Sequence, residues 1–199
     1  LAVSKLFFGY ATGVNLMFPF AVGATIALFP QRSTPEEMFA QIARFRPTIL
    51  CSVPTSIAGM LADPKRTPAD LRPLRLLTSA GEALPAELYR RWKERFGVEI
   101  LDGLGSTEML HIFLSNRPGG VRYGTTGVPV PGYELRIGGD DGQSAGPGEA
   151  GELQINGPTA ATAYWNNREK SRTTFQGAWT RSGDKYSIDG HGHYVYAGG

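Results

Sequence analysis

Residues 102–111 gather the side chains of this sequence that are best suited to chemistry at a phosphate. The stretch, DGLGSTEMLH, holds two glycines, two hydroxyls and a carboxylate before its final apolar residues and histidine. Glycine lets a backbone approach a ligand closely, the Thr107 hydroxyl suits a phosphate oxygen, and the adjacent Glu108 carboxylate suits Mg²⁺. An ordinary turn, in which Ser106, Thr107 and Glu108 cap a following helix, explains the same residues.

Two more segments place polar groups where the edge of a sheet is expected. Ser-Ala-Gly-Glu at 79–82 follows one apolar run, and 103–106 follows another, so both loops should reach the same rim of one sheet. Further on, Arg-Ser-Gly-Asp at 181–184 puts a carboxylate after a glycine turn. The Asp184 carboxylate can accept two hydrogen bonds from a ribose diol, although Gly183-Asp184 alone is equally an ordinary turn.

Hydrophobic periodicity and turn residues predict the elements that position these loops. Apolar runs predict buried strands at residues 23–29, 48–53, 74–78 and 98–101, with helices between them that follow Thr34, Pro54 and Pro85. Residues 34–37 have the form of a capping box with proline at the first helical position. Pro47 should end that helix and Gly97 the helix from Pro85. This alternation predicts a mostly parallel sheet flanked by helices.

Beyond about Asn116 the pattern changes to short alternating runs between turns. Residues 134–137 and 152–155 alternate apolar and polar, and Asp141-Gly142 and Asp189-Gly190 are hairpin signals. This half predicts a small, distorted antiparallel β-barrel. The predicted fold class is therefore α/β, with an α/β part at 1–115 and a β-barrel-like part at 116–199.

Composition excludes several classes of protein. The chain of 199 residues is 41% hydrophobic and 19% charged, as globular proteins are, and a net charge of +2 argues against nucleic acid or an anionic membrane as partner. Cys51 is the only cysteine, which predicts a reducing, cytoplasmic compartment without internal disulfides. The uncharged stretch 6–30 is long enough to span a bilayer. Because Asn15 and Pro19 interrupt it, a core helix, a break and a strand fit it better than a membrane span.

The sequence resembles the adenylate-forming acyl-CoA synthetase superfamily in five segments, which are residues 79–82, 105–108, 151–157, 164–167 and 181–184. Residues 106–113 and 164–167 look most like benzoate-CoA ligases and related aryl-acid ligases. The resemblance implies part of the large domain of such an enzyme and a two-step reaction. A carboxylate attacks the α-phosphate of Mg·ATP, giving an acyl-adenylate and pyrophosphate. The thiolate of coenzyme A then displaces AMP to give the thioester.

The same resemblance implies a role for individual residues. Thr107 would hold the α-phosphate, Glu108 would ligate Mg²⁺, and Asp184 would bind the ribose hydroxyls. Two backbone segments would enclose the adenine, and their residues are Gly81, Glu82, Ala83, Asp102, Gly103 and Leu104. Many relatives carry tyrosine at the Leu104 position, so the contact with adenine would be aliphatic here.

An acyl pocket follows from the same match, with Tyr10, Phe18, Ala80, Gly105, His111 and Ile112 as its lining. A flat aromatic acid suits a slot walled by rings and glycine backbone. Without the resemblance, Tyr10 and Phe18 would be ordinary core residues, and His111 a satisfied core histidine. His191 and His193 lie beside a turn and are too few to predict a metal site.

Parts of the family pattern are expected outside residues 1–199, namely the phosphate-gripping loop with its lysine and a C-terminal domain with a catalytic lysine. Residues 123–129 are Gly- and Thr-rich, but Val130 stands where that loop would need lysine. We therefore expect residues 1–199 alone to catalyse neither step. Other hypotheses remain open: a non-catalytic nucleotide-binding module, a membrane-associated piece, or a ligase for hydroxy-, amino- or halobenzoate or a cinnamate-like acid. A homodimer is one candidate for its assembly.

Overall fold

The computed structural model of the protein describes residues 1–138, 145–146 and 148–198. The chain divides into two compact units. The first comprises Leu1–Asp102 with Arg117–Gly124, and the second Gly103–Asn116 with Thr125–Gly199. Our division at 115/116 stays a proposal about domains, and the turn expected at Asp141-Gly142 lies outside the described residues.

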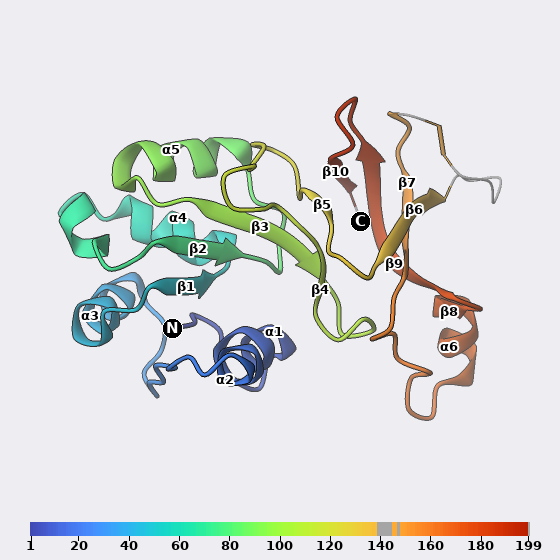
Figure 1. The fold of residues 1–199 in the computed structure, drawn as a ribbon, viewed down its shortest axis with the longest axis horizontal. Coiled ribbons are helices and arrows are strands. Elements are labelled where there is room, and N and C mark those ends of the chain that lie inside the picture. The colour runs from blue at the N-terminus through green and yellow to red at the C-terminus, as the bar shows by residue number, and fades with distance from the viewer. Residues whose placement is uncertain (139–144, 147, 199) are drawn as a thin grey trace. The chain divides into compact units, whose positions relative to one another are not determined.

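The first unit is built on parallel strands, as the sequence predicts. They are β1 (Ile49–Ser52), β2 (Leu76–Ser79) and the beginning of β3 (Ile100–Gly105). β1 pairs with β2 from Ile49 opposite Leu76, and β2 pairs with β3 up to Ser79 opposite Asp102. The covering helices are α3 (Pro35–Phe45), α4 (Pro54–Ala62), α5 (Ala86–Phe96) and the 3₁₀ turn η2 (Pro68–Leu71). Figure 1 shows α4 and α5 together on one side of these strands.

Local signals explain where these helices begin and end. The Thr34 hydroxyl accepts a hydrogen bond from the Glu37 backbone N–H at 3.3 Å, which caps α3. This is half of the expected capping box, because the Glu37 carboxylate accepts from Gln41 instead. α5 ends at Gly97, whose φ of +73° favours glycine. Its buried face carries Tyr89, Trp92 and Phe96, which anchor it in the core of the unit.

The N-terminal segment differs from the prediction. It forms one helical run, made of α1 (Gly9–Thr12), a π-helical turn (Gly13–Met17) and α2 (Phe18–Ala21). Pro19 does not break this run, because it lies in the first turn of α2, where a missing N–H is tolerated. The run is also not a buried core helix, since Met17, Phe18 and Phe20 are exposed. No helix in the described part of the chain is long and apolar enough to cross a bilayer.

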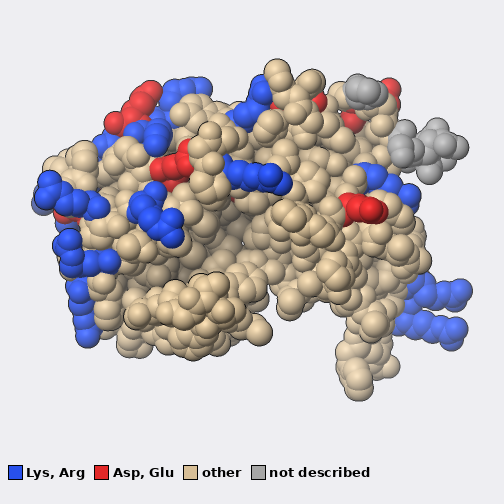
Figure 2. All heavy atoms as spheres, in the orientation of Figure 1, with Lys and Arg blue, Asp and Glu red and all other residues tan. Residues whose placement is uncertain are grey.

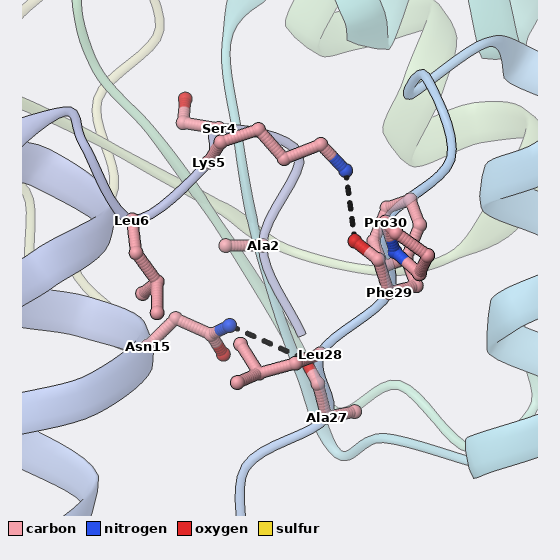
Figure 3. Close-up of a pocket in the computed structure, with 9 residues that line it drawn as sticks. All are labelled: Ala2, Ser4, Lys5, Leu6, Asn15, Ala27, Leu28, Phe29 and Pro30. Atoms are coloured by element: carbon pink, nitrogen blue, oxygen red, sulfur yellow. Dashed lines mark hydrogen bonds between the residues drawn. The ribbon is translucent and has the colours of Figure 1, made fainter.

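The strand predicted at 23–29 does not form. Its backbone carbonyls bind side chains rather than a neighbouring strand: Asn15 donates to the Ala27 carbonyl at 3.2 Å, and the Lys5 ammonium donates to the Phe29 carbonyl at 3.1 Å. Figure 3 shows both contacts in a cavity of about 370 Å³. The Lys5 ammonium also donates to the Gln31 carbonyl at 2.6 Å, so Lys5 and Asn15, which line this cavity, both serve to hold the backbone of the segment.

The second unit is antiparallel, as predicted. The end of β3 pairs with β4 (Ile112–Ser115), and β4 pairs with β5 (Val128–Pro129). A second, curled sheet has the order β10-β9-β7-β6, with β8 added beside β9. These strands are β6 (Glu134–Gly138), β7 (Gly151–Asn156), β8 (Phe175–Gln176), β9 (Trp179–Ile188) and β10 (Tyr194–Gly198). Phe113, Leu153 and Ile155 are fully buried in its core.

Two details of the second unit bear on the site. The hairpin predicted at Asp189-Gly190 is present, since β9 and β10 pair antiparallel on either side of it. The Asp189 carboxylate accepts from the backbone N–H groups of His191 and His193 in the turn, at 2.8 and 2.9 Å. The short helix α6 (Arg168–Thr174) was not predicted, and the side chain of Asn167 caps it.

On the face shown in Figure 2, Lys and Arg side chains are interspersed with Asp and Glu. This distribution agrees with the small net charge of +2.

Candidate active site

The catalytic candidates lie on a loop between two antiparallel strands. β3 continues through Gly105, so Gly103 and Leu104 are strand residues paired with Ser115 and Leu114 rather than part of a loop. The loop itself is Ser106–His111, and a strand, β4, follows it. The interpretation of this stretch as the cap of a following helix is therefore wrong.

Glycine at 105 is required by the return of this loop. A Cβ at Gly105 would lie 2.5 Å from the His111 carbonyl oxygen, closer than two such atoms approach. Within the loop, the Ser106 hydroxyl accepts from the Met109 N–H at 3.2 Å, and Leu110 turns the chain with φ of +70°. Met109 is fully buried and fixes the loop to the core of the unit.

Glu108 is the best-defined chemical group of the loop. The Tyr164 hydroxyl donates to its carboxylate Oε1 at 2.6 Å, and its backbone carbonyl accepts from the Ala161 N–H at 2.7 Å. Burial raises the pKa of the Glu108 carboxyl, but hydrogen bonds, above all the one from Tyr164, and the charge of Lys170 outweigh burial and leave the pKa below its usual value. The same bond raises the pKa of Tyr164, so its hydroxyl remains the donor. Glu108 is thus an ionised, half-exposed carboxylate beside the exposed Thr107.

This donor set fits Mg²⁺ held jointly with a substrate. Mg²⁺ is usually bound through one or two carboxylates together with substrate phosphates and waters. Across the described residues, no three His, Cys, Asp or Glu side chains cluster as a closed metal cage would require, and this includes His191 and His193. A single ionised carboxylate next to a hydroxyl therefore matches a shared site, with Glu108 as the residue that would hold the ion.

Asp184 lies on a β-bulge in β9, not on the turn that the sequence suggested. The pairing of β9 with β7 shifts register there, and Gly183 has φ of +82°. Ser182 fixes the bulge, because its hydroxyl donates to the Leu153 carbonyl at 2.8 Å and accepts from the Asp184 N–H at 3.1 Å. Burial raises the pKa of the half-buried Asp184. Bulges of this kind re-aim a side chain, here a carboxylate.

The residues predicted to contact adenine are divided between the two units. Gly81, Glu82, Ala83 and Asp102 belong to the first unit, and Gly103 and Leu104 belong to the second. Asp102 is buried and pairs with Ser79, the last residue of β2. Residues 80–83 follow Ser79 in the chain. Gly81, with φ of +91°, turns the chain, and Gly81, Glu82 and Ala83 are exposed. Thr55 donates to the Glu82 carboxylate at 2.9 Å. These positions leave backbone available to a flat ring.

Half of the predicted acyl pocket also belongs to the first unit. The Tyr10 hydroxyl contacts the Thr78 hydroxyl at 2.6 Å, and burial raises the pKa of Tyr10. Phe18 and Thr78 line one cavity of about 700 Å³. Ala80 is buried and follows directly after the last residue of β2. Gly105, His111 and Ile112 belong to the second unit. The six residues as one pocket, and the site as a whole, stay a prediction.

Sequence reasoning missed the partner of Glu108. Tyr164 was noticed as part of the segment 164–167, but its hydrogen bond spans 56 positions in the chain. The available signal is that Tyr164 and the Ser-Thr-Glu stretch both lie in segments that carry the resemblance to the family.

Comparison with known proteins identifies the family. The family described as AMP-binding enzyme matches residues 1–165, so the chain belongs to the AMP-binding enzyme family. It is 57% identical to a benzoate–CoA ligase of Thauera aromatica, over 99% of this chain and 38% of that protein. The chain therefore spans well under half the length of the curated relative.

Two solved structures extend the likeness to the fold. A benzoate CoA ligase from Burkholderia xenovorans LB400 superposes with a TM-score of 0.95 and 55% identity, over 99% of this chain and 40% of that one. An anthranilate CoA ligase in complex with anthranoyl-AMP gives a TM-score of 0.96 and 49% identity, over 99% of this chain and 38% of that one. The α/β sheet joined to a curled antiparallel sheet is thus the fold of these adenylate-forming enzymes.

Proposed function

We propose that the protein containing these residues is an ATP-dependent aryl-acid CoA ligase, with benzoate or a closely related acid as its substrate. The observation that carries the proposal is the ionised Glu108 carboxylate, set by Tyr164 beside the exposed Thr107. The 57% identity to a benzoate–CoA ligase supports the choice of acid.

In the first step, the acid attacks the α-phosphate of ATP and pyrophosphate leaves. The Thr107 hydroxyl donates to an α-phosphate oxygen, where negative charge develops. Glu108 would hold Mg²⁺, which when bound would spread the phosphate charge. In the second step, the thiolate of coenzyme A attacks the acyl carbon and AMP leaves as the mixed anhydride breaks.

The remaining predicted residues bind and orient the nucleotide. The Asp184 carboxylate accepts hydrogen bonds from the ribose hydroxyls, for which its bulge fixes the direction. For the adenine we propose contacts with the backbone of residues 81–83, which are exposed, and with the strand residues 102–104. Orientation of this kind lowers the entropic cost of bringing the reacting atoms together.

The residues that we propose for the acyl site are Tyr10, Phe18, Ala80, Gly105, His111 and Ile112. Two of these residues carry aromatic rings, and Gly105 exposes backbone, so a flat ring fits better than a flexible chain. Aminobenzoate is a second candidate acid, because the chain is 49% identical to an anthranilate CoA ligase.

We also propose that the protein acts in the cytoplasm, on the acid, ATP and coenzyme A. The buried, unbridged Cys51 is compatible with a reducing compartment. A homodimer stays a prediction, which light scattering of the complete protein would test.

The test of this function is an acid panel on the complete protein. AMP release is measured with benzoate, 4-hydroxybenzoate, 2-aminobenzoate, acetate and palmitate, each with ATP, Mg²⁺ and coenzyme A. We expect the aromatic acids to give a higher kcat/KM than acetate or palmitate. Equal turnover of palmitate and benzoate would contradict the aromatic assignment. If none of the acids in the panel led to release of AMP, a nucleotide-binding module would be the better explanation.

A further inference from the structure

The segment 159–164 contacts the loop Ser106–His111 in two different ways. Two of its residues bind the loop backbone: the Ala161 N–H donates to the Glu108 carbonyl at 2.7 Å, and the Thr159 hydroxyl donates to the Met109 carbonyl at 2.6 Å. Tyr164 binds the Glu108 side chain, through a hydrogen bond of 2.6 Å. The backbone contacts shape the loop, whereas the Tyr164 contact reaches the carboxylate.

Tyr164 is itself held in place by its surroundings. Its backbone N–H donates to the Ser171 hydroxyl at 2.9 Å, and its ring packs against Phe175 with centroids 5.3 Å apart. The Lys170 ammonium lies 4.8 Å from the centre of the ring. These three partners belong to α6 and the residue after it, so this short helix and its end anchor the tyrosine.

We propose that Tyr164 is a positioning residue, which fixes the direction of the Glu108 carboxylate so that it can hold the metal ion of the nucleotide. The inference rests on the proposed function of Glu108. A glutamate side chain has several rotamers, and an anchored hydroxyl selects among them. A carboxylate has about four lone-pair positions, so accepting this bond leaves others for a cation. Partners that orient a metal ligand in this way are commonly needed for full metal affinity.

The substitution that tests the inference is Tyr164→Phe in the complete protein. It removes one oxygen and keeps the ring that contacts Phe175 and Lys170. Tyr194→Phe is the matched control, because it removes a hydroxyl of the same unit that donates to the Leu135 carbonyl, at 3.2 Å, rather than to the Glu108 carboxylate. ATP binding is measured by calorimetry as a function of Mg²⁺ concentration, and hydrogen exchange is followed in residues 106–111.

We expect Tyr164→Phe to raise the Mg²⁺ concentration for half-maximal ATP binding by roughly tenfold, while Tyr194→Phe leaves it unchanged. Exchange of the loop amides should stay as in the unsubstituted protein, because Thr159 and Ala161 still hold the backbone. Excess Mg²⁺ should restore ATP binding and kcat in Tyr164→Phe, with an unchanged KM for the acid.

An unchanged Mg²⁺ dependence would overturn the inference, as would a loss that excess Mg²⁺ does not restore, since a merely structural defect is insensitive to the ion. Glu108→Gln separates this failure from failure of the proposed function. If Glu108→Gln changes the Mg²⁺ dependence and Tyr164→Phe does not, only the positioning role is wrong. If neither changes it, the assignment of Glu108 to the metal is wrong.

Discussion

The residues after β2 and the loop between β3 and β4 both follow a strand, yet they are held differently. Residues 81–83 are exposed, and Glu82 is contacted by the Thr55 hydroxyl. The loop Ser106–His111 is tied to its unit by the buried Met109 and by contacts from residues 159–164.

The difference follows from what each loop is proposed to do. A segment that offers backbone to a flat ring needs only the right path of the chain. A loop that presents a charged ligand must hold one carboxylate within about 0.5 Å of its working position, which requires support from a second layer of contacts. The open loop should therefore tolerate changes that the supported loop does not.

The largest effect on stability is expected for Met109→Ala. Removing a fully buried methionine side chain leaves a cavity and costs roughly 2–5 kcal/mol. In the open loop, Glu82→Gln should change stability by only about 0.5 kcal/mol. Denaturant unfolding of the complete protein measures both, and similar losses for the two variants would mean that the two loops are not held differently.

A smaller but sharper contrast is expected between two glycines. Gly105→Ala places a Cβ 2.5 Å from a backbone carbonyl oxygen, and we expect a loss of roughly 2–3 kcal/mol. Gly81→Ala has its nearest neighbouring atom at 3.9 Å and carries only the strain of a positive φ, about 1 kcal/mol. Thermal melting gives the order. A Gly81→Ala protein less stable than Gly105→Ala would show that the loop return is not tight.

The smallest effects concern pH and two carboxylates of the second unit, which should behave in opposite directions. The pKa of Glu108 is lowered on folding, so its ionised form adds stability above the unfolded pKa, and this is lost as pH falls through the folded pKa. The pKa of Asp184 is raised by burial, so stability falls as pH rises from the unfolded pKa through the folded pKa.

We therefore expect Glu108→Gln to lower the melting temperature at pH 7 and Asp184→Asn to raise it. Both differences should shrink towards pH 3, where both carboxyls of the unsubstituted protein become protonated. Melting curves of the complete protein between pH 3 and pH 7 test this. A stabilising Glu108→Gln would mean that burial, and not the Tyr164 bond, dominates at that residue.

Most of the helices and strands of the first unit could be predicted because their signals are local. The cap at Thr34, the glycine at 97 and the apolar face of α5 each lie within a few residues of the structure they determine. The exception is 23–29, which has the composition of a strand. Its carbonyls are bound by Asn15 and Lys5, and no local pattern records such contacts.

In the second unit the alternating strands were predictable, whereas the support of the site was not. Glycines at 103 and 105 suggested a loop, but pairing with β4 makes them part of a strand. The polar helix α6 has no apolar periodicity to detect. Tyr164 reaches Glu108 across 56 positions, so its contact depends on the path of the whole unit.

The central claim is that the carboxylate of Glu108, held by its loop and by Tyr164, supports adenylation. Its most direct test is pyrophosphate exchange by the complete protein with Glu108→Gln, which keeps the shape of the side chain and removes its charge. We predict a loss on the order of 10²-fold or more while the protein remains folded. Exchange close to that of the unsubstituted protein, with only a change in stability, would contradict the account and leave Glu108 a structural residue.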